Sequence, residues 1–148
     1  MNIYKTKLRE TLVSQLTFFD EELTMFLDRY LPASDDVRIV RERKNMKAFI
    51  ERYMFKLEQH LKHHTLDEDI PCPDFVFLGS TVTVQYEDTN HLESYTLCLP
   101  EESDPDTSCI SMISPLGSQL LMAVKDSQIT IVTPGQITKV TIVDIKYS

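Results

Sequence analysis

The stretch LPASDDV at residues 31–37 decides how the first half of this chain folds. Pro32 cannot continue a helical hydrogen-bond ladder, so a helix that reaches it must end there. Ser34, Asp35 and Asp36 follow, and these residue types favour the cap or first turn of a new helix. The stretch therefore predicts a tight turn between two helices.

Apolar residues recur at helical spacing on both sides of this turn, in steps of three and four. The first stripe is Leu8, Leu12, Leu16, Phe19, Leu23, Phe26 and Tyr30, and the second is Met46, Ile50, Tyr53, Leu57 and Leu61. Residues 4–30 contain no Gly or Pro, which predicts a first helix roughly 40 Å long. The second helix is expected to end near residues 63–65. Because the turn is short, we predict an antiparallel helical hairpin, a coiled coil, over residues 1–70.

The second half alternates apolar and polar residues, which is typical of strands. We expect strands at residues 80–86, 95–99, 109–113, 129–133 and 137–146, with a Pro134-Gly135 turn before the last. Ser114 and Pro115 should open one short helix, as cap and first helical residue. Residues 75–148 are thus predicted to form a small antiparallel sheet with one helix. The fold class is α+β.

The composition limits the classes of protein to which this chain can belong. The chain has 148 residues, 42% of them hydrophobic, which argues against global disorder. No apolar run approaches the roughly 20 residues that cross a bilayer, so a soluble cytoplasmic protein without a membrane partner is expected. Cys72, Cys98 and Cys109 form no CxxC pair and are interpreted as reduced, partly buried thiols.

The formal charge of -8 is distributed unevenly. Residues 1–64 carry 12 Lys/Arg and 10 Asp/Glu, whereas residues 65–148 carry 3 Lys/Arg and 13 Asp/Glu. Phosphate binding needs neutralising cations, so the acidic half is a poor candidate for nucleic-acid binding. Two parts with different partners are indicated.

Three segments of the second half occur in a characteristic order. They are VFLGSTVTV at residues 76–84, ISMISPLG at 110–117 and IVTPG at 131–135, with VDIKY at 143–147 closing the series. In order and spacing they resemble the C-terminal domain of the GreA/GreB transcription elongation factors. The first half resembles that family in its layout, a helical hairpin ahead of this domain.

The resemblance implies an FKBP-like sheet domain that docks on RNA polymerase and a hairpin that enters the secondary channel. In the family, acidic residues at the hairpin tip help to hold a second magnesium ion at the polymerase active centre, where backtracked RNA is hydrolysed. Asp35 and Asp36 occupy the tip here. The protein would then hold no cofactor or metal of its own, share magnesium with the polymerase, and act as a monomer rather than as an enzyme.

The tip departs from the family pattern, which reads roughly Gly-Asp-Leu-x-Glu-Asn. Here the two carboxylates are adjacent, and capping of the second helix is an alternative role for both. An inhibitory channel binder, like the anti-Gre factors or the Rnk-type relatives, therefore remains open. So does an interaction module that dimerises through the hairpin. A prolyl isomerase is disfavoured, because the chain has no Trp and few aromatics in the sheet.

Other candidate residues follow from spacing or from the resemblance. The basic cluster is Arg38, Arg41, Arg43, Lys44 and Lys47, four of which step by three and should share a broad helix face that could meet RNA or an acidic polymerase surface. By resemblance, the candidates for polymerase docking are Ser114, Pro115, Leu116 and Gly117. His60 and His64 are one turn apart but lack an obvious third metal ligand, so complementing the helix dipole is the simpler role.

Overall fold

The computed structural model describes residues 3–63 and 70–147, with side chains from residue 7 onward in the first range. The chain divides into two compact units, Met1–Pro71 and Cys72–Ser148. Within the described residues, no helix has both the length and the apolar character needed to cross a membrane.

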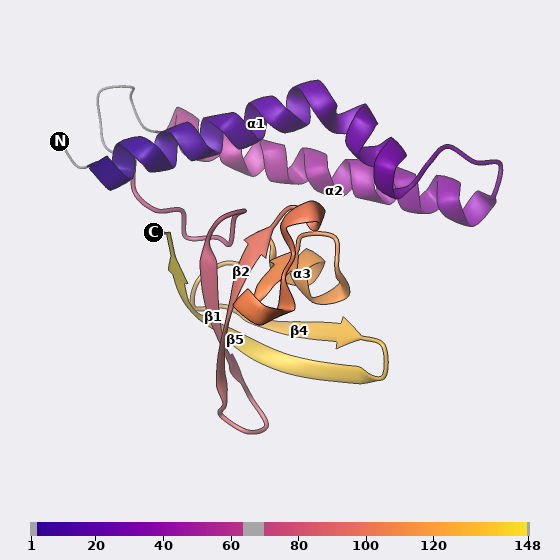
Figure 1. Ribbon diagram of the computed structural model, residues 1–148. Coiled ribbons are helices and arrows are strands. Elements are labelled where there is room, and N and C mark those ends of the chain that lie inside the picture. Colours follow the sequence, from indigo (N-terminus) through magenta and orange to yellow (C-terminus); the bar gives the residue numbers. More distant parts are fainter. Residues whose placement is uncertain (1–2, 64–69, 148) are drawn as a thin grey trace. The chain divides into compact units, whose positions relative to one another are not determined.

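The first unit contains two long helices, α1 (Ile3–Tyr30) and α2 (Val37–Lys62), joined by residues 31–36. They lie side by side and run in opposite directions (Figure 1). The predicted hairpin is confirmed, and its helix boundaries differ from expectation by at most three residues. Helix α2 is capped at its C-terminal end by His63, while His64 and Thr65 lie outside the described residues.

The predicted apolar stripes supply the packing of the hairpin. From these stripes, Leu8, Leu12, Phe19, Phe26, Ile50, Tyr53 and Leu57 are buried. The Phe19 and Tyr53 rings meet edge to face across the helices, with centroids 6.2 Å apart. The Tyr53 hydroxyl donates a hydrogen bond to the side-chain amide oxygen of Gln15 on α1. This bond gives the hydroxyl of a buried side chain a polar partner.

The second unit is built on a five-stranded sheet in the order β3-β2-β1-β5-β4. The strands are β1 (Thr81–Tyr86), β2 (Leu92–Cys98), β3 (Cys109–Ser111), β4 (Gln128–Thr133) and β5 (Gln136–Lys146). Strands β4 and β5 form a long hairpin, light orange and yellow in Figure 1. Gly135 in its turn has a φ of +83°, a conformation that glycine adopts without strain.

One strand pair differs from the antiparallel expectation. Strand β3 is shorter than predicted and pairs with β2 in parallel, with Thr96 opposite Cys109. Two short 3₁₀ helices, η1 (Pro100–Glu102) and η2 (Pro105–Thr107), lie in the connection. They bring the chain back beside Thr96 of β2, where β3 begins, so that β3 runs in the same direction as β2. The remaining pairs are antiparallel.

The core of this unit lies between the sheet and the short helix α3 (Pro115–Leu120), which packs against β3 and β4. Buried side chains come from β1, β2, β5 and α3, namely Val82, Val84, Leu97, Val140, Ile142 and Leu120. The tight turn before β1 depends on Ser80, whose hydroxyl accepts from the Phe77 amide at 3.0 Å and donates to the Phe77 carbonyl at 2.6 Å.

The three cysteines are free thiols, but their environments differ. Cys98 is buried, Cys109 is half-buried, and Cys72 is exposed, which corrects the expectation that all three are partly buried. Burial raises the pKa of the Cys98 thiol to about 11, with the neighbouring Cys109 adding to the effect. Cys98 is therefore almost entirely protonated, and unreactive as a nucleophile, at neutral pH.

Candidate functional site

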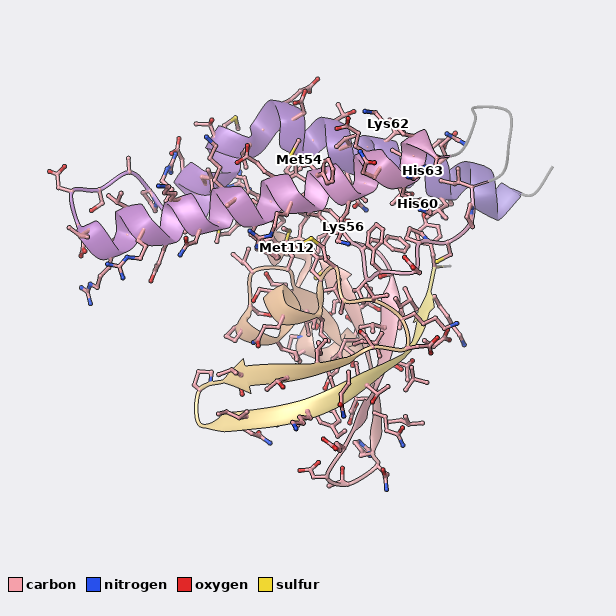
Figure 2. The ribbon with its side chains drawn as sticks, turned by 180° about the vertical axis from the view of Figure 1, so that it is seen from behind. Met54, Lys56, His60, Lys62, His63 and Met112 are labelled. Atoms are coloured by element: carbon pink, nitrogen blue, oxygen red, sulfur yellow. The ribbon has the colours of Figure 1, made fainter. Side chains whose placement is uncertain are left out.

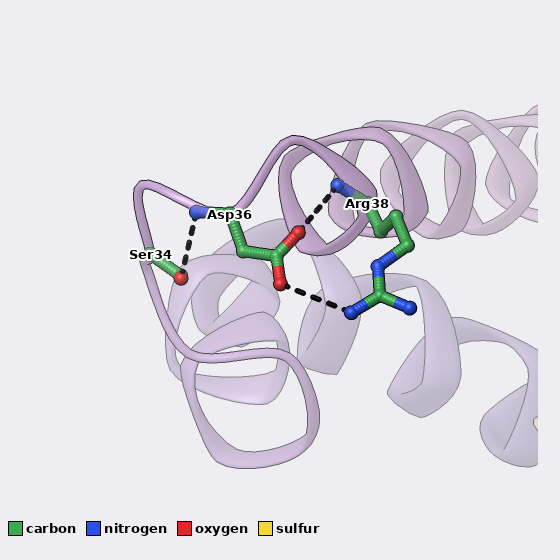
Figure 3. Close-up of polar contacts among 3 residues, drawn as sticks. All are labelled: Ser34, Asp36 and Arg38. Carbon is green, nitrogen blue, oxygen red and sulfur yellow. Dashed lines mark hydrogen bonds and ion pairs between the residues drawn. The ribbon is translucent and has the colours of Figure 1, made fainter.

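The hairpin end is the first candidate site, and its turn is fixed by Asp36. The Asp36 carboxylate caps α2, because its Oδ1 accepts from the Arg38 backbone amide at 2.9 Å. The Asp36 amide in turn donates to the Ser34 hydroxyl at 3.0 Å (Figure 3). The Arg38 guanidinium lies 3.5 Å from Oδ2. Asp36 therefore has the predicted capping role, while its side chain remains 40% exposed.

Asp35 lies beside this cap and is exposed, as are Pro32, Ala33 and Ser34. The turn thus presents two adjacent carboxylates that differ in how they contact the helix. Asp36 is oriented by its hydrogen bond to the helix, and Asp35 is not part of the cap. Carboxylate oxygens are the ligands that hard divalent cations prefer. The pair could add ligands to a metal held by another protein.

Arg43 differs from the other four predicted cations because its side chain forms contacts within the hairpin. Its guanidinium donates to the Leu31 carbonyl at 2.9 Å and lies 2.8 Å from the Asp28 carboxylate. Both contacts reach across to α1 and the start of the turn. Arg43 therefore joins the two helices at the hairpin end, and it does not belong to an exposed basic face.

The other four cations, Arg38, Arg41, Lys44 and Lys47, are all exposed. At about 100° per residue, Arg38 and Lys47 point to nearly opposite sides of α2. The four cations are therefore spread over about half the circumference of the helix. Lys44 and Lys47 border a groove of about 370 Å³ at the hairpin end.

This groove combines an apolar floor with a basic rim. Leu23 and Leu27 of α1 line it together with Ile39 and Val40 of α2, and Arg43, Lys44 and Lys47 supply the charge. Val40 is 52% exposed and Val37 nearby is 70% exposed. The sequence interpretation missed these valines, although two apolar residues within a basic stretch were a readable signal.

The histidines near the end of α2 do not form a metal site among the described residues. His60 and His63 both lie there (Figure 2), and the His60 ring nitrogen is 2.8 Å from the Pro71 carbonyl oxygen. The proposed partner His64 lies outside the described residues. In the described part of the chain, no three His, Cys, Asp or Glu side chains are placed to hold a metal together.

The second candidate site is the first turn of α3. The Ser114 hydroxyl accepts from the Gly117 amide at 2.9 Å and donates to the Ser111 carbonyl at 2.8 Å, so it caps the helix. Gly117 is buried, and a Cβ there would lie 1.9 Å from the Ser111 carbonyl oxygen. Ser114 and Gly117 are thus used in building the turn. Pro115, which is exposed, and Leu116, which is half-buried, are available to a partner.

Sequence reasoning also missed Gln119, which connects α3 to the edge strand β4. Its side-chain nitrogen donates to the carbonyl of Val132 at 2.6 Å, and its side-chain oxygen accepts from the Val132 amide at 2.8 Å. The same nitrogen donates to the Pro115 carbonyl at 2.6 Å. A glutamine in a short helix carries no sequence signal for such contacts, which depend on how α3 meets β4.

Comparison with known proteins gives a consistent result. The family described as transcription elongation factor, GreA/GreB, C-term, matches residues 71–147. Transcription elongation factor GreA of Chloroflexus aurantiacus is 33% identical over 104 residues, which cover 70% of this chain and 66% of that protein. GreA of Bacillus subtilis is 35% identical over 102 residues, 69% of this chain and 65% of its own length.

The chain therefore spans just under two thirds of the length of these relatives. Among solved structures, the prokaryotic transcription elongation factor GreA/GreB from Nitrosomonas europaea superposes with a TM-score of 0.50 at 26% identity, covering 66% of this chain and 79% of that one. The matching family covers the whole described sheet unit, and the relatives extend beyond it. This chain belongs to the GreA/GreB family of transcription elongation factors.

Proposed function

We propose that this chain binds RNA polymerase and inserts its hairpin end into the secondary channel, where it modulates cleavage of backtracked RNA. The observation that carries the proposal is the position of Asp35 and Asp36. Both lie at the turn of a hairpin whose helices have 28 and 26 residues, a rod about 40 Å long. Family membership supports transcription as the process in which this rod acts.

The acidic turn fits a role as a partial metal site. Two carboxylates are too few to hold a divalent cation that needs six oxygen ligands, so the chain would complete a site on the polymerase. A second magnesium ion at such a centre stabilises the attacking and leaving oxygens of the hydrolysis. In this arrangement the cap bond orients the Asp36 carboxylate, and Asp35 contributes an exposed carboxylate that is not part of the cap.

The exposed cations of α2 would make contacts in the same secondary channel. Lys44 and Lys47 border the groove at the hairpin end, and Arg38 and Arg41 lie closer to the turn. Their charges can neutralise RNA phosphates or meet acidic polymerase surface inside the channel. Because they spread over about half the circumference of the helix, they offer contacts on more than one side of the rod.

The test uses polymerase complexes stalled in a backtracked register, with the full chain and two sets of variants. Asp35→Asn with Asp36→Asn removes both charges but retains an Asn cap, which is about as good as Asp. Glu42→Gln, an exposed acid further along α2, is the matched control. We expect the wild type and Glu42→Gln to shorten the RNA, and the double variant to bind equally but cleave at least tenfold more slowly.

Each other outcome contradicts a defined part of the proposal. Absence of binding by the wild type would remove the polymerase as partner. Binding that slows elongation without cleavage would make the chain an inhibitory channel binder. Equal cleavage by the double variant would remove the role of the tip acids.

A further inference from the structure

The face of the sheet that carries the core changes from apolar to polar toward the β1–β2 turn. Tyr95 of β2 is opposite Val82 of β1, which is buried. Two residues earlier on β2, Glu93 is opposite Val84, which is also buried. Residues directly opposite each other in antiparallel strands point to the same side of the sheet. Tyr95 and Glu93 therefore lie on the core face, although Tyr95 is only half-buried and Glu93 is exposed.

These two side chains help to line an open pocket of about 810 Å³. Tyr86, Asp88 and His91 contribute from the end of β1 and the turn that follows it, and Gln136 and Thr138 contribute from the start of β5. The volume lies within the range of ligand sites in proteins. We refer to this pocket as the sheet-end pocket.

The sheet-end pocket is negatively charged. With His neutral, Asp88 and Glu93 give it two negative charges. The His91 ring nitrogen is 2.7 Å from Oε1 of Glu93, and this contact leaves Oε2 available to a ligand. The Asp88 carboxylate has no partner within the described part of the chain. Both carboxylates can therefore accept hydrogen bonds from a bound group.

The cations of the sheet unit do not compensate this charge. Residues 72–147 carry only three Lys/Arg, and none of them lines the pocket. Lys125 and Lys146 lie 3.9 and 3.6 Å from the Asp144 carboxylate. Lys139 precedes the buried Val140 on β5, so its side chain points to the opposite face of the sheet. The ligand that fits the pocket is therefore itself a cation.

The polar groups of the pocket match a guanidinium. This planar cation carries five N–H donors in a fixed geometry, so it can bind carboxylates with paired hydrogen bonds and stack on an aromatic ring. The Tyr86 and Tyr95 hydroxyls are hydrogen-bonded to each other at 2.8 Å in the same pocket. Burial raises the pKa of Tyr95, and the hydrogen bond with Tyr86 adds to the effect. The hydroxyl stays protonated, so the carboxylates alone supply the charge.

Other ligand classes fit less well. A metal ion would need a further ligand, because no three His, Cys, Asp or Glu side chains of the described residues are placed to hold one together. Phosphates and nucleic acids would be repelled by both carboxylates. A lysine ammonium is a compact, strongly hydrated charge and lacks the planar set of donors.

We propose that the sheet-end pocket binds the guanidinium of an arginine side chain that an exposed protein segment presents. An arginine within a segment has no free carboxylate, whereas the carboxylate of the free amino acid would be repelled by Asp88 and Glu93. The inference goes beyond the proposed function, because the chain binds this ligand without RNA polymerase.

The test titrates the isotope-labelled full chain with short blocked peptides and follows its amide signals by NMR. The peptide acetyl-Gly-Arg-Gly-amide should shift the amides of Asp88, Glu93 and Tyr95 in a saturable way. The same peptide with citrulline, which has nearly the same shape but no charge, should bind at least about tenfold more weakly. The lysine peptide and free L-arginine should each bind at least about threefold more weakly.

Variants locate the binding to the pocket. Asp88→Asn and Glu93→Gln each remove one charge with little change of shape, so each should weaken binding of the arginine peptide at least about threefold. Glu87→Gln is the matched control, because Glu87 is an exposed acid of the same turn that does not line the pocket. Its expected effect is less than twofold, and the amide spectra establish that each variant is folded.

The absence of saturable shifts with the arginine peptide would overturn the inference, as would equal binding of the citrulline peptide. Equal affinity for the lysine peptide would contradict recognition of a guanidinium. Free arginine that binds as tightly as the peptide would assign the pocket to the amino acid instead of a protein segment. Equal weakening by Glu87→Gln and Glu93→Gln would contradict binding in the pocket. None of these results involves the hairpin acids or the polymerase, so failure here leaves the proposed function standing.

Discussion

Replacing Arg43 with methionine should destabilise the helical hairpin selectively. The Arg43 guanidinium donates to the Leu31 carbonyl at 2.9 Å and lies 2.8 Å from the Asp28 carboxylate, so it joins α2 to the end of α1. Methionine retains most of the aliphatic stem while removing both polar contacts. The effect of the substitution therefore reports on those contacts more than on packing.

The expected loss follows from the exposure of the two contacts. A hydrogen bond from a charged donor to a carbonyl contributes about 1.5–3 kcal/mol. The Asp28 side chain is 55% exposed, so the ion pair is screened by solvent and contributes about 0.2–1 kcal/mol. We expect Arg43→Met to lower the free energy of unfolding by about 2–3 kcal/mol. Asp28→Asn, which removes only the ion pair, should lower it by less than about 1 kcal/mol.

Urea unfolding followed by far-UV circular dichroism measures this difference, because α1 and α2 have 28 and 26 residues and α3 only 6. Arg41→Met is the matched control, since Arg41 is exposed two residues away on the same helix. Its expected effect is below about 0.5 kcal/mol. Equal effects of Arg43→Met and Arg41→Met would refute the reasoning. An effect of Asp28→Asn as large as that of Arg43→Met would assign the stabilisation to the ion pair.

Three further predictions concern the sheet unit. Gly117→Ala places a Cβ 1.9 Å from the Ser111 carbonyl oxygen, so α3 must shift and the free energy of unfolding should fall by about 3 kcal/mol; a melting temperature equal to that of the wild type would contradict this. Gln119→Ala removes both side-chain bonds to Val132, which should cost about 1–3 kcal/mol and speed hydrogen exchange of the Val132 amide; unchanged exchange would show that these bonds do not protect the edge. Burial raises the pKa of Cys98 from 9.0 to about 11, so between these pH values the folded chain keeps a proton that the unfolded chain releases, and stability should fall as pH rises through this window. The fall in the urea midpoint should be smaller in Cys98→Ala, and equal falls would exclude Cys98 as its source.

The elements that could be predicted from the sequence are those with strong local signals. The long apolar stripes predicted α1 and α2, because a helix that buries one face along its whole length repeats that face every three to four residues. The Ser114-Pro115 cap and the Pro134-Gly135 turn were also predicted, since each depends on the conformational preference of its own residues. Capping by Asp36 belongs to the same class, because donor and acceptor are two residues apart.

The predictions that failed depend on partners distant in sequence. Arg43 was grouped with its neighbours by charge, but its role is set by Leu31 and Asp28 on the other side of the hairpin. The parallel pairing of β3 was missed because a three-residue strand does not encode its direction, which the 3₁₀ turns before it decide.

By itself, the amino-acid order determined the helical rod, the acidic turn at its end, the family resemblance of the second half and the separation of charge between the two halves. Each of these depends on periodicity, composition or short-range geometry, all of which are properties of neighbouring residues. Only the tertiary structure decided which charged side chains form contacts within the fold. It also decided that Gln119 binds the backbone of Val132 on the edge strand, and that the Val132 and Ile137 side chains are exposed. Those outcomes require two segments to meet in space, and no local pattern records which segments will do so.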